Sequence, residues 1–176
     1  MRRLPIGVQD FEDMITSGYV YVDKTDLIYK LATESKQYFL GRPRRFGKSL
    51  LISTLKAYFQ GKRELFRGLA IEELEKEWKS YPVIHLDMSG ANYSAVSALT
   101  QCLADQFRLF EDQYGLPNGD NNTVSSSRFY NLIAGIYKKS GERVVVLVDE
   151  YDKPLIDALG DEKLHDSLRS ELRAIY

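Results

Sequence analysis

Three short stretches of the chain are almost continuously apolar and do not alternate between apolar and polar residues. They occupy residues 37–40, 82–87 and 143–148, and the third consists almost entirely of β-branched residues. Apolar runs of this length are typical of strands that are covered on both faces of a sheet. We therefore expect three buried strands.

The segments between these strands show the spacing of amphipathic helices. Helices are predicted over residues 48–59, 94–114 and 127–139. The second helix carries one apolar face, formed by Val96, Leu99, Leu103, Phe107 and Phe110. Gly115 is its expected C-terminal stop. Residues 115–126 are rich in Asn, Asp, Gly and Ser, so we expect a mobile surface loop there.

Strands that alternate with helices and are apolar throughout predict an α/β fold with a parallel sheet and helices on both faces, in three layers. Residues 37–176 are expected to form this core. Residues 1–36 are expected to form lead-in helices packed on it, one of which begins with Thr25 as its N-cap. Ligands of such sheets bind at the carboxyl ends of the strands, so the residues that follow each strand are the candidates for chemistry.

The segment from Gly41 to Ser49, after the first strand, has the features of a phosphate-binding loop. It reads Gly-Arg-Pro-Arg-Arg-Phe-Gly-Lys-Ser and leads directly into a helix. Phosphate binding requires converging backbone N–H groups, a glycine where the chain approaches closely, and a helix N-terminus. Gly47, Lys48, Ser49 and Leu50 supply these features. The alternative is that Gly-Lys-Ser merely starts a helix.

Several residues of this loop have an expected role. Lys48 would reach the β- and γ-phosphates and take part in catalysis, and the Ser49 hydroxyl would bind Mg²⁺. Arg42 stands where the usual spacing has a glycine. Arg44 and Arg45 either contact phosphates and carry transition-state charge, or form salt bridges that hold the loop. The complete expected nucleotide-binding set is Gly41, Arg44, Arg45, Phe46, Gly47, Lys48, Ser49 and Leu50.

An acidic pair, Asp149 and Glu150, follows the third strand. An apolar strand that ends in such a pair has the form of a Walker B segment, in which Asp149 binds Mg²⁺ or its water shell. Glu150 would then orient the attacking water as a general base. The alternative is a helix N-cap with a solvated neighbour. Asp87, after the second strand, either faces the phosphates or caps the next loop.

Net charge, cysteine content and the length of apolar runs limit the expected partners and location of the protein. The formal net charge of −1 provides no general positive field for nucleic acid or an anionic membrane. Cys102 is the single cysteine, which argues against a disulfide framework and fits a reducing compartment. No apolar run approaches the roughly 18 residues of a membrane span, and no apolar segment of a signal peptide follows the basic N-terminus. We expect a cytoplasmic location and no membrane partner.

The chain resembles the AAA-ATPase-like family of bacterial proteins. The matching residues are Leu4-Pro5-Ile6-Gly7 with Phe11, Tyr21-Val22-Asp23-Lys24-Thr25, Arg42-Pro43-Arg44-Arg45-Phe46-Gly47-Lys48-Ser49-Leu50, and Leu147-Val148-Asp149-Glu150-Tyr151-Asp152-Lys153-Pro154. The resemblance implies a P-loop NTPase fold that binds ATP and Mg²⁺ and hydrolyses ATP. It also implies a restriction-nuclease-like domain downstream, through which nucleic acid would be reached. Arg42 in place of glycine is then a trait of the family.

ATPases of this type usually have a sheet of five strands, and the sequence ends at Tyr176, in the first helix after the acidic pair. We therefore expect a fold that is truncated there, with apolar sheet edges that favour self-association and slow turnover by the isolated chain. The leading function is an ATPase module that switches a downstream or partner domain. The alternatives are a non-hydrolysing nucleotide-binding or interaction module and a small-molecule phosphotransferase.

Overall fold

The chain forms two compact units, Met1–Val83 and Ile84–Tyr176. The structure is a computed structural model, and it describes residues 3–41, 43, 46–120 and 123–175. The domain boundary expected after residue 36 stays a prediction. Among the described residues, no helix combines the length and the apolar character needed to cross a membrane.

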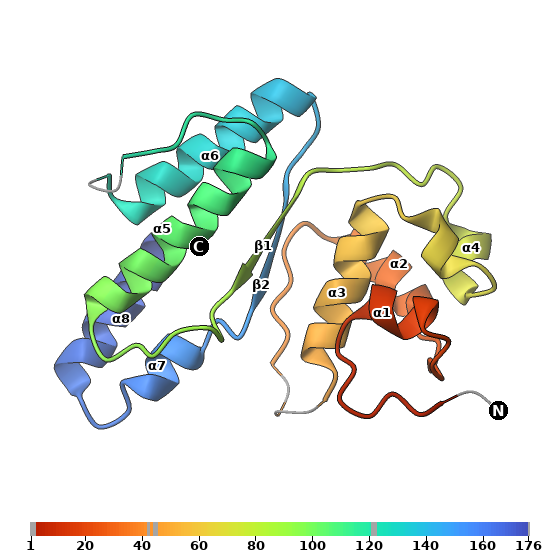
Figure 1. Cartoon of the computed structure of the whole chain (residues 1–176), viewed down its shortest axis with the longest axis horizontal. Coiled ribbons are helices and arrows are strands. Elements are labelled where there is room, and N and C mark those ends of the chain that lie inside the picture. The colour runs from red at the N-terminus through yellow and green to blue at the C-terminus, as the bar shows by residue number, and fades with distance from the viewer. Residues whose placement is uncertain (1–2, 42, 44–45, 121–122, 176) are drawn as a thin grey trace. The chain divides into compact units, whose positions relative to one another are not determined.

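The first unit consists of short helices (Figure 1), and several of its core residues are aromatic. Its elements are α1 (Phe11–Thr16), α2 (Thr25–Glu34), α3 (Lys48–Phe59), the 3-10 helix η1 (Arg63–Phe66) and α4 (Ala70–Leu74). Helix α1 packs against α3, and α2 packs against α4. The buried residues of this core are Phe11, Ile28, Ala57, Tyr58, Leu65, Phe66 and Ile71. The helix predicted over residues 48–59 is confirmed at both ends.

Helices α2 and α4 share one capping group at their N-termini. The Asp23 carboxylate accepts hydrogen bonds from the backbone N–H of Thr25 at 2.8 Å and of Ala70 at 2.7 Å. The buried Thr25 hydroxyl donates to the same carboxylate at 2.7 Å and accepts from the N–H of Ile71 at 3.0 Å. The prediction that Thr25 is the N-cap of its own helix is therefore wrong. Lys24 occupies that position, and Thr25 caps α4 instead.

Replacing Asp23 with alanine is expected to lower the free energy of unfolding by about 2 kcal/mol, because it removes a cap from two helices and one lost cap costs about 1 kcal/mol. Asp23→Asn keeps a side-chain acceptor and is expected to cost less. Urea unfolding followed by circular dichroism measures the difference, with the exposed residue change Asp112→Ala as the control. Equal stabilities of the Asp23→Ala and Asp112→Ala variants would contradict shared capping.

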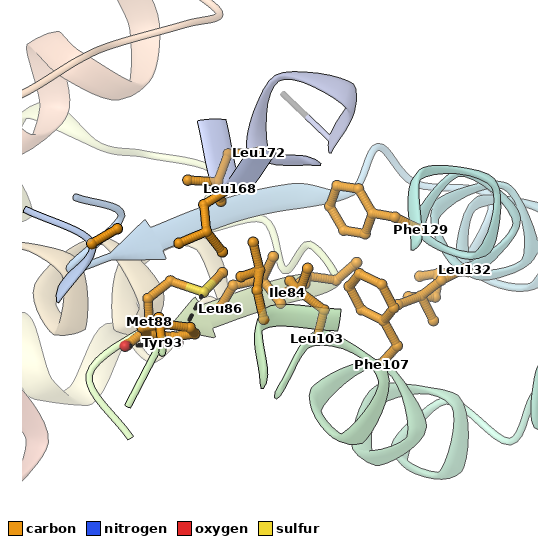
Figure 2. Close-up of a cluster of buried hydrophobic side chains, with 13 residues drawn as sticks. Ile84, Leu86, Met88, Tyr93, Leu103, Phe107, Phe129, Leu132, Leu168 and Leu172 are labelled. Atoms are coloured by element: carbon orange, nitrogen blue, oxygen red, sulfur yellow. Dashed lines mark hydrogen bonds between the residues drawn. The ribbon is translucent and has the colours of Figure 1, made fainter. Parts of the chain in front are cut away.

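The second unit combines a two-stranded parallel sheet with a layer of helices. Its elements are β1 (Val83–Asp87), which begins at the last residue of the first unit, α5 (Val96–Gln113), α6 (Ser125–Ser140), β2 (Val145–Asp149), α7 (Lys153–Asp157) and α8 (Glu162–Ile175). Helices α5, α6 and α8 pack against one another. They cover the face of β1 that carries Ile84 and Leu86, and Met88, directly after the strand, belongs to the same core (Figure 2).

The sequence-based expectations for this unit are largely confirmed. Both strands and both helices expected within residues 82–148 are present, and their ends differ from the predicted ones by at most two residues. The predicted apolar face of α5 is buried at Leu99, Leu103 and Phe107. Gly115 follows the helix with a φ of +61°, as expected for a left-handed stop.

The strand predicted at residues 37–40 is not present. These residues are irregular, and the side chains of Tyr38 and Phe39 are 53% and 76% exposed. An apolar run of four residues is too short to distinguish a strand from a connecting segment, which explains the error. Among the described residues the sheet therefore has two strands. The chain has a mixed α/β architecture, and the three-layer P-loop arrangement stays a prediction.

A buried ion pair anchors the connection between α5 and α6. Arg128 donates from Nε to Oε1 of Glu111 at 2.9 Å and from a terminal nitrogen to Oε2 at 2.7 Å. The two side chains are 3% and 5% exposed. Glu111 also accepts a hydrogen bond from the backbone N–H of Gly119. The connection at residues 115–126, expected to be a mobile loop, is thus tied to α5 at Gly119.

Candidate functional site

Helix α3 begins after a glycine, Gly47, which has no side chain with which to cap the first turn. Gly47 has a φ of +73°, a left-handed conformation that costs residues with a Cβ about 1–2 kcal/mol. The first helical hydrogen bond runs from the N–H of Leu51 to the carbonyl of Gly47, at 3.0 Å. The N–H groups of Lys48, Ser49 and Leu50 therefore have no partner inside the helix. No described side chain caps this helix.

The charge at the start of α3 differs from that at the other α-helices of the first unit. Helix α1 has Asp10 as its cap, and α2 and α4 share Asp23. Helix α3 has no acidic residue in its first turn and begins with Lys48. Since a helix N-terminus carries partial positive charge, Lys48 adds like charge there. A phosphate group would compensate both charges and accept from the open N–H groups, so these residues fit the predicted ligand.

The other residues of the predicted loop differ in placement. Gly41 and Phe46 are exposed, and Phe46 is 62% exposed. Leu50 is half-buried and packs against the core of the first unit. The arginines of the loop lie outside the described residues, so their expected contacts stay predictions; they are Arg42, Arg44 and Arg45.

Strand β2 ends at the buried carboxylate of Asp149, which is 8% exposed. Its Oδ1 atom accepts a hydrogen bond from the backbone N–H of Glu150 at 2.9 Å. Its backbone carbonyl accepts one from the N–H of Met88 at 3.1 Å, which pairs the ends of the two strands. The following helix, α7, has Asp152 at its N-cap. Asp149 is therefore not the cap of that helix, contrary to the alternative reading of the acidic pair.

Glu150 is half-buried and has a left-handed backbone conformation, with a φ of +50°. For a residue with a long side chain, this conformation costs on the order of 1 kcal/mol. The Glu150 carbonyl accepts a hydrogen bond from the N–H of Lys153 at 2.9 Å, which connects the turn to α7. Strain of this kind is most often retained at functional sites, where the surrounding structure enforces it.

Asp87, at the end of β1, matches the loop-capping alternative. Its Oδ1 atom accepts a hydrogen bond from the N–H of Ser89 at 2.8 Å. Its own backbone N–H donates to Oε1 of Gln106 at 2.8 Å, and its carbonyl accepts from Nε2 of Gln106 at 3.0 Å. The exposed carboxylate of Asp87 is therefore committed to the turn that follows the strand.

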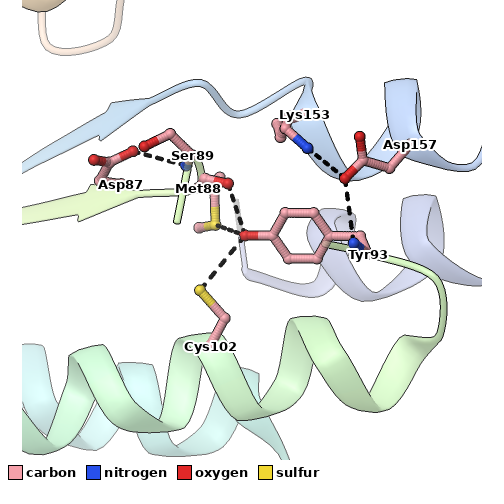
Figure 3. A network of polar contacts seen from close by, with 7 residues as sticks. All are labelled: Asp87, Met88, Ser89, Tyr93, Cys102, Lys153 and Asp157. Carbon is pink, nitrogen blue, oxygen red and sulfur yellow. Dashed lines mark hydrogen bonds and ion pairs between the residues drawn. The ribbon is translucent and has the colours of Figure 1, made fainter. Parts of the chain in front are cut away.

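Three residues without a role in the sequence-based predictions form a polar network near this strand end (Figure 3). Asp157 accepts hydrogen bonds from the side chain of Lys153 and from the backbone N–H of Tyr93. The i,i+4 spacing of Lys153 and Asp157 is a helical pairing signal that a sequence can provide. No sequence pattern connects either residue to Tyr93, which lies 64 residues before Asp157.

The predicted phosphate loop belongs to the first unit, and the acidic pair belongs to the second. Residues 5–176 match a family model described as a predicted AAA-ATPase. A protein of Azotobacter chroococcum mcd 1, described as an uncharacterized protein in the vnfD 5' region, is 37% identical over 99% of this chain. The chain spans 34% of the length of that relative. No solved structure matches significantly. The chain belongs to the AAA-ATPase-like family.

Proposed function

We propose that this chain is the nucleotide-binding part of a longer ATPase. It binds ATP with Mg²⁺ and hydrolyses the bond between the β- and γ-phosphates. The observation that carries this proposal is the open N-terminus of α3, where Gly47 precedes Lys48 and Ser49 and no described side chain caps the helix. A first turn whose N–H groups have no side-chain cap among the described residues, together with a lysine and no carboxylate, favours an anion. Membership of a family described as predicted AAA-ATPases supports a nucleotide as the source of that anion.

Each motif residue has a distinct proposed role. Lys48 contributes a compact positive charge to the β- and γ-phosphates, and the Ser49 hydroxyl binds Mg²⁺. Asp149 contributes a carboxylate to the Mg²⁺ water shell, and Glu150 accepts a proton from the attacking water. Mg²⁺ would supply charge neutralisation on the phosphate oxygens. Arg44 and Arg45 are proposed to contact the phosphates.

The chain covers about a third of its curated relative, 34% of that protein's length. We therefore propose that hydrolysis in the complete protein switches a downstream or partner domain. The restriction-nuclease-like domain implied by the sequence resemblance is one such domain. Through it, the protein would act on nucleic acid.

Isothermal titration calorimetry with ATP and Mg²⁺ tests this proposal. Lys48→Ala is expected to weaken binding at least tenfold, because a hydrogen bond to a charged group contributes about 1.5–3 kcal/mol. Lys56→Ala is the matched control, since it removes the same charge from the last turn of the same helix. We expect it to leave the affinity nearly unchanged. Wild-type chain that binds no ATP, or equal losses in both variants, would contradict the proposed site.

A further inference from the structure

A closed ring of contacts surrounds the turn between β2 and α7 in the second unit. The ring starts at the carbonyl of Asp149, which accepts from the N–H of Met88 at 3.1 Å. The carbonyl of Met88 in turn accepts from the hydroxyl of Tyr93 at 2.9 Å. Met88, directly after β1, is thereby connected to the acidic pair through its N–H and to Tyr93 through its carbonyl.

The second half of the ring returns to the acidic pair through α7. The backbone N–H of Tyr93 donates to Oδ2 of Asp157 at 3.2 Å, and Lys153 forms an ion pair with the same oxygen. The backbone N–H of Lys153 donates to the carbonyl of Glu150 at 2.9 Å. The ammonium group of Lys153 also lies over the Tyr93 ring, 5.9 Å from its centre. Figure 3 shows how Tyr93 faces Met88 with its hydroxyl and Asp157 with its backbone.

Glu150 is the residue that this ring holds in a strained conformation. Its carbonyl is fixed by Lys153, and the preceding carbonyl, that of Asp149, is fixed by Met88. A left-handed conformation in a residue with a long side chain persists only where the surroundings enforce it. The ring provides contacts on both sides of this residue, so it can set the direction in which the Glu150 side chain leaves the strand end.

The hydroxyl of Tyr93 needs an explanation beyond packing. The side chain is fully buried in the core of the second unit. A phenylalanine would fill nearly the same volume without placing a polar group in an apolar environment, which is costly unless the group is hydrogen-bonded. Burial is the main cause that raises the pKa of Tyr93, and the nearby thiol of Cys102 raises it further. The hydroxyl therefore stays protonated and remains a donor to Met88.

We infer that Tyr93 is a positioning residue for Glu150, acting through the ring that Met88, Lys153 and Asp157 complete. This inference rests on the proposed function for its catalytic consequence, because Glu150 is the proposed general base. Its structural content does not depend on that proposal. Tyr93 fixes the backbone of the strand end, and the strand end fixes the conformation of the acidic pair.

The first test is the backbone conformation of residue 150 in crystal structures of three variants. Tyr93→Phe removes only the hydroxyl. Lys153→Met breaks the ion pair with Asp157 and so opens the ring. Because Lys153 is partly exposed, this second variant is expected to fold even if Tyr93→Phe does not. Both are expected to move φ of Glu150 out of the left-handed region. Tyr137→Phe, at a residue that is 55% exposed on α6, is the control and is expected to leave φ positive. A positive φ at residue 150 in both ring variants would overturn the inference.

The second test separates this inference from the proposed function. ATP binding and turnover are measured for the wild-type chain and for Tyr93→Phe. We expect kcat to fall about tenfold or more with KM nearly unchanged, because misplacing a catalytic group by about 1 Å can cost roughly a hundredfold. A wild-type chain without ATP binding would count against the proposed function, while the φ measurement still decides the structural role of Tyr93. Wild-type turnover that Tyr93→Phe retains in full would overturn the positioning role alone.

Discussion

Arg128→Met is expected to lower the free energy of unfolding by about 3–5 kcal/mol, because it leaves the carboxylate of Glu111 buried without its partner. Both side chains are almost completely buried, and two parallel hydrogen bonds join them. Chemical unfolding of the wild type and the variant measures the loss.

Two controls distinguish a buried pair from ion pairs in general. Lys62→Met breaks a partly exposed pair with Glu12, and it is expected to cost less than about 1 kcal/mol. The double change Glu111→Leu with Arg128→Met removes both charges, so most of the lost stability should return. An Arg128→Met variant no less stable than Lys62→Met would show that the pair contributes little.

The same pair predicts the direction of a pH dependence. The hydrogen bonds from Arg128 lower the pKa of Glu111, and they outweigh burial, which raises it. Because the pKa is lower in the folded chain than in the unfolded chain, the stabilisation is complete above the unfolded value. It is lost as the pH falls through the folded value. Acid unfolding of the double variant should lack this component.

Glu150→Gln is expected to lower kcat for ATP hydrolysis by about 10²–10⁴-fold, since an amide cannot accept the proton that a general base removes. ATP affinity should remain nearly unchanged, because the phosphate loop is intact. Turnover is measured by phosphate release and affinity by calorimetry, with Glu162→Gln as the control at an exposed residue of α8.

Three outcomes of the Glu150→Gln experiment have different meanings. Loss of turnover with retained affinity supports Glu150 as the general base. Full turnover in the variant would place the base elsewhere. ATP binding by the wild type without any turnover would favour the alternative of a non-hydrolysing nucleotide-binding module.

Elements with a long, regular apolar pattern could be predicted from the sequence. Residues 48–59 form the expected helix, which follows Gly47 and buries Thr54, Ala57 and Tyr58. The face of α5 that carries Leu99, Leu103 and Phe107 is buried as expected, and Gly115 ends the pattern. In these segments local preference and packing favour the same structure, so the periodicity alone was sufficient.

Features that depend on partners distant in sequence could not be predicted. The hydroxyl of Thr25 accepts a hydrogen bond from the N–H of Ile71 in α4, 46 residues later in the chain. The contact between Tyr93 and Asp157 likewise spans 64 residues. The run at residues 37–40 was misassigned because a strand is defined by hydrogen bonds to a neighbour, which composition does not encode.

The side chain of Gln106 has a consequence for how the sheet can grow. Along a strand, successive residues direct their backbone N–H and C=O groups to opposite sides, and the N–H of Met88 bonds to β2. The N–H and carbonyl of Asp87 therefore point away from β2, and both are bonded to the amide of Gln106. That amide takes the place of a neighbouring strand at this residue. Another polypeptide that added to this border of β1 would have to displace Gln106 first, so the border is protected against uncontrolled assembly at its carboxyl end.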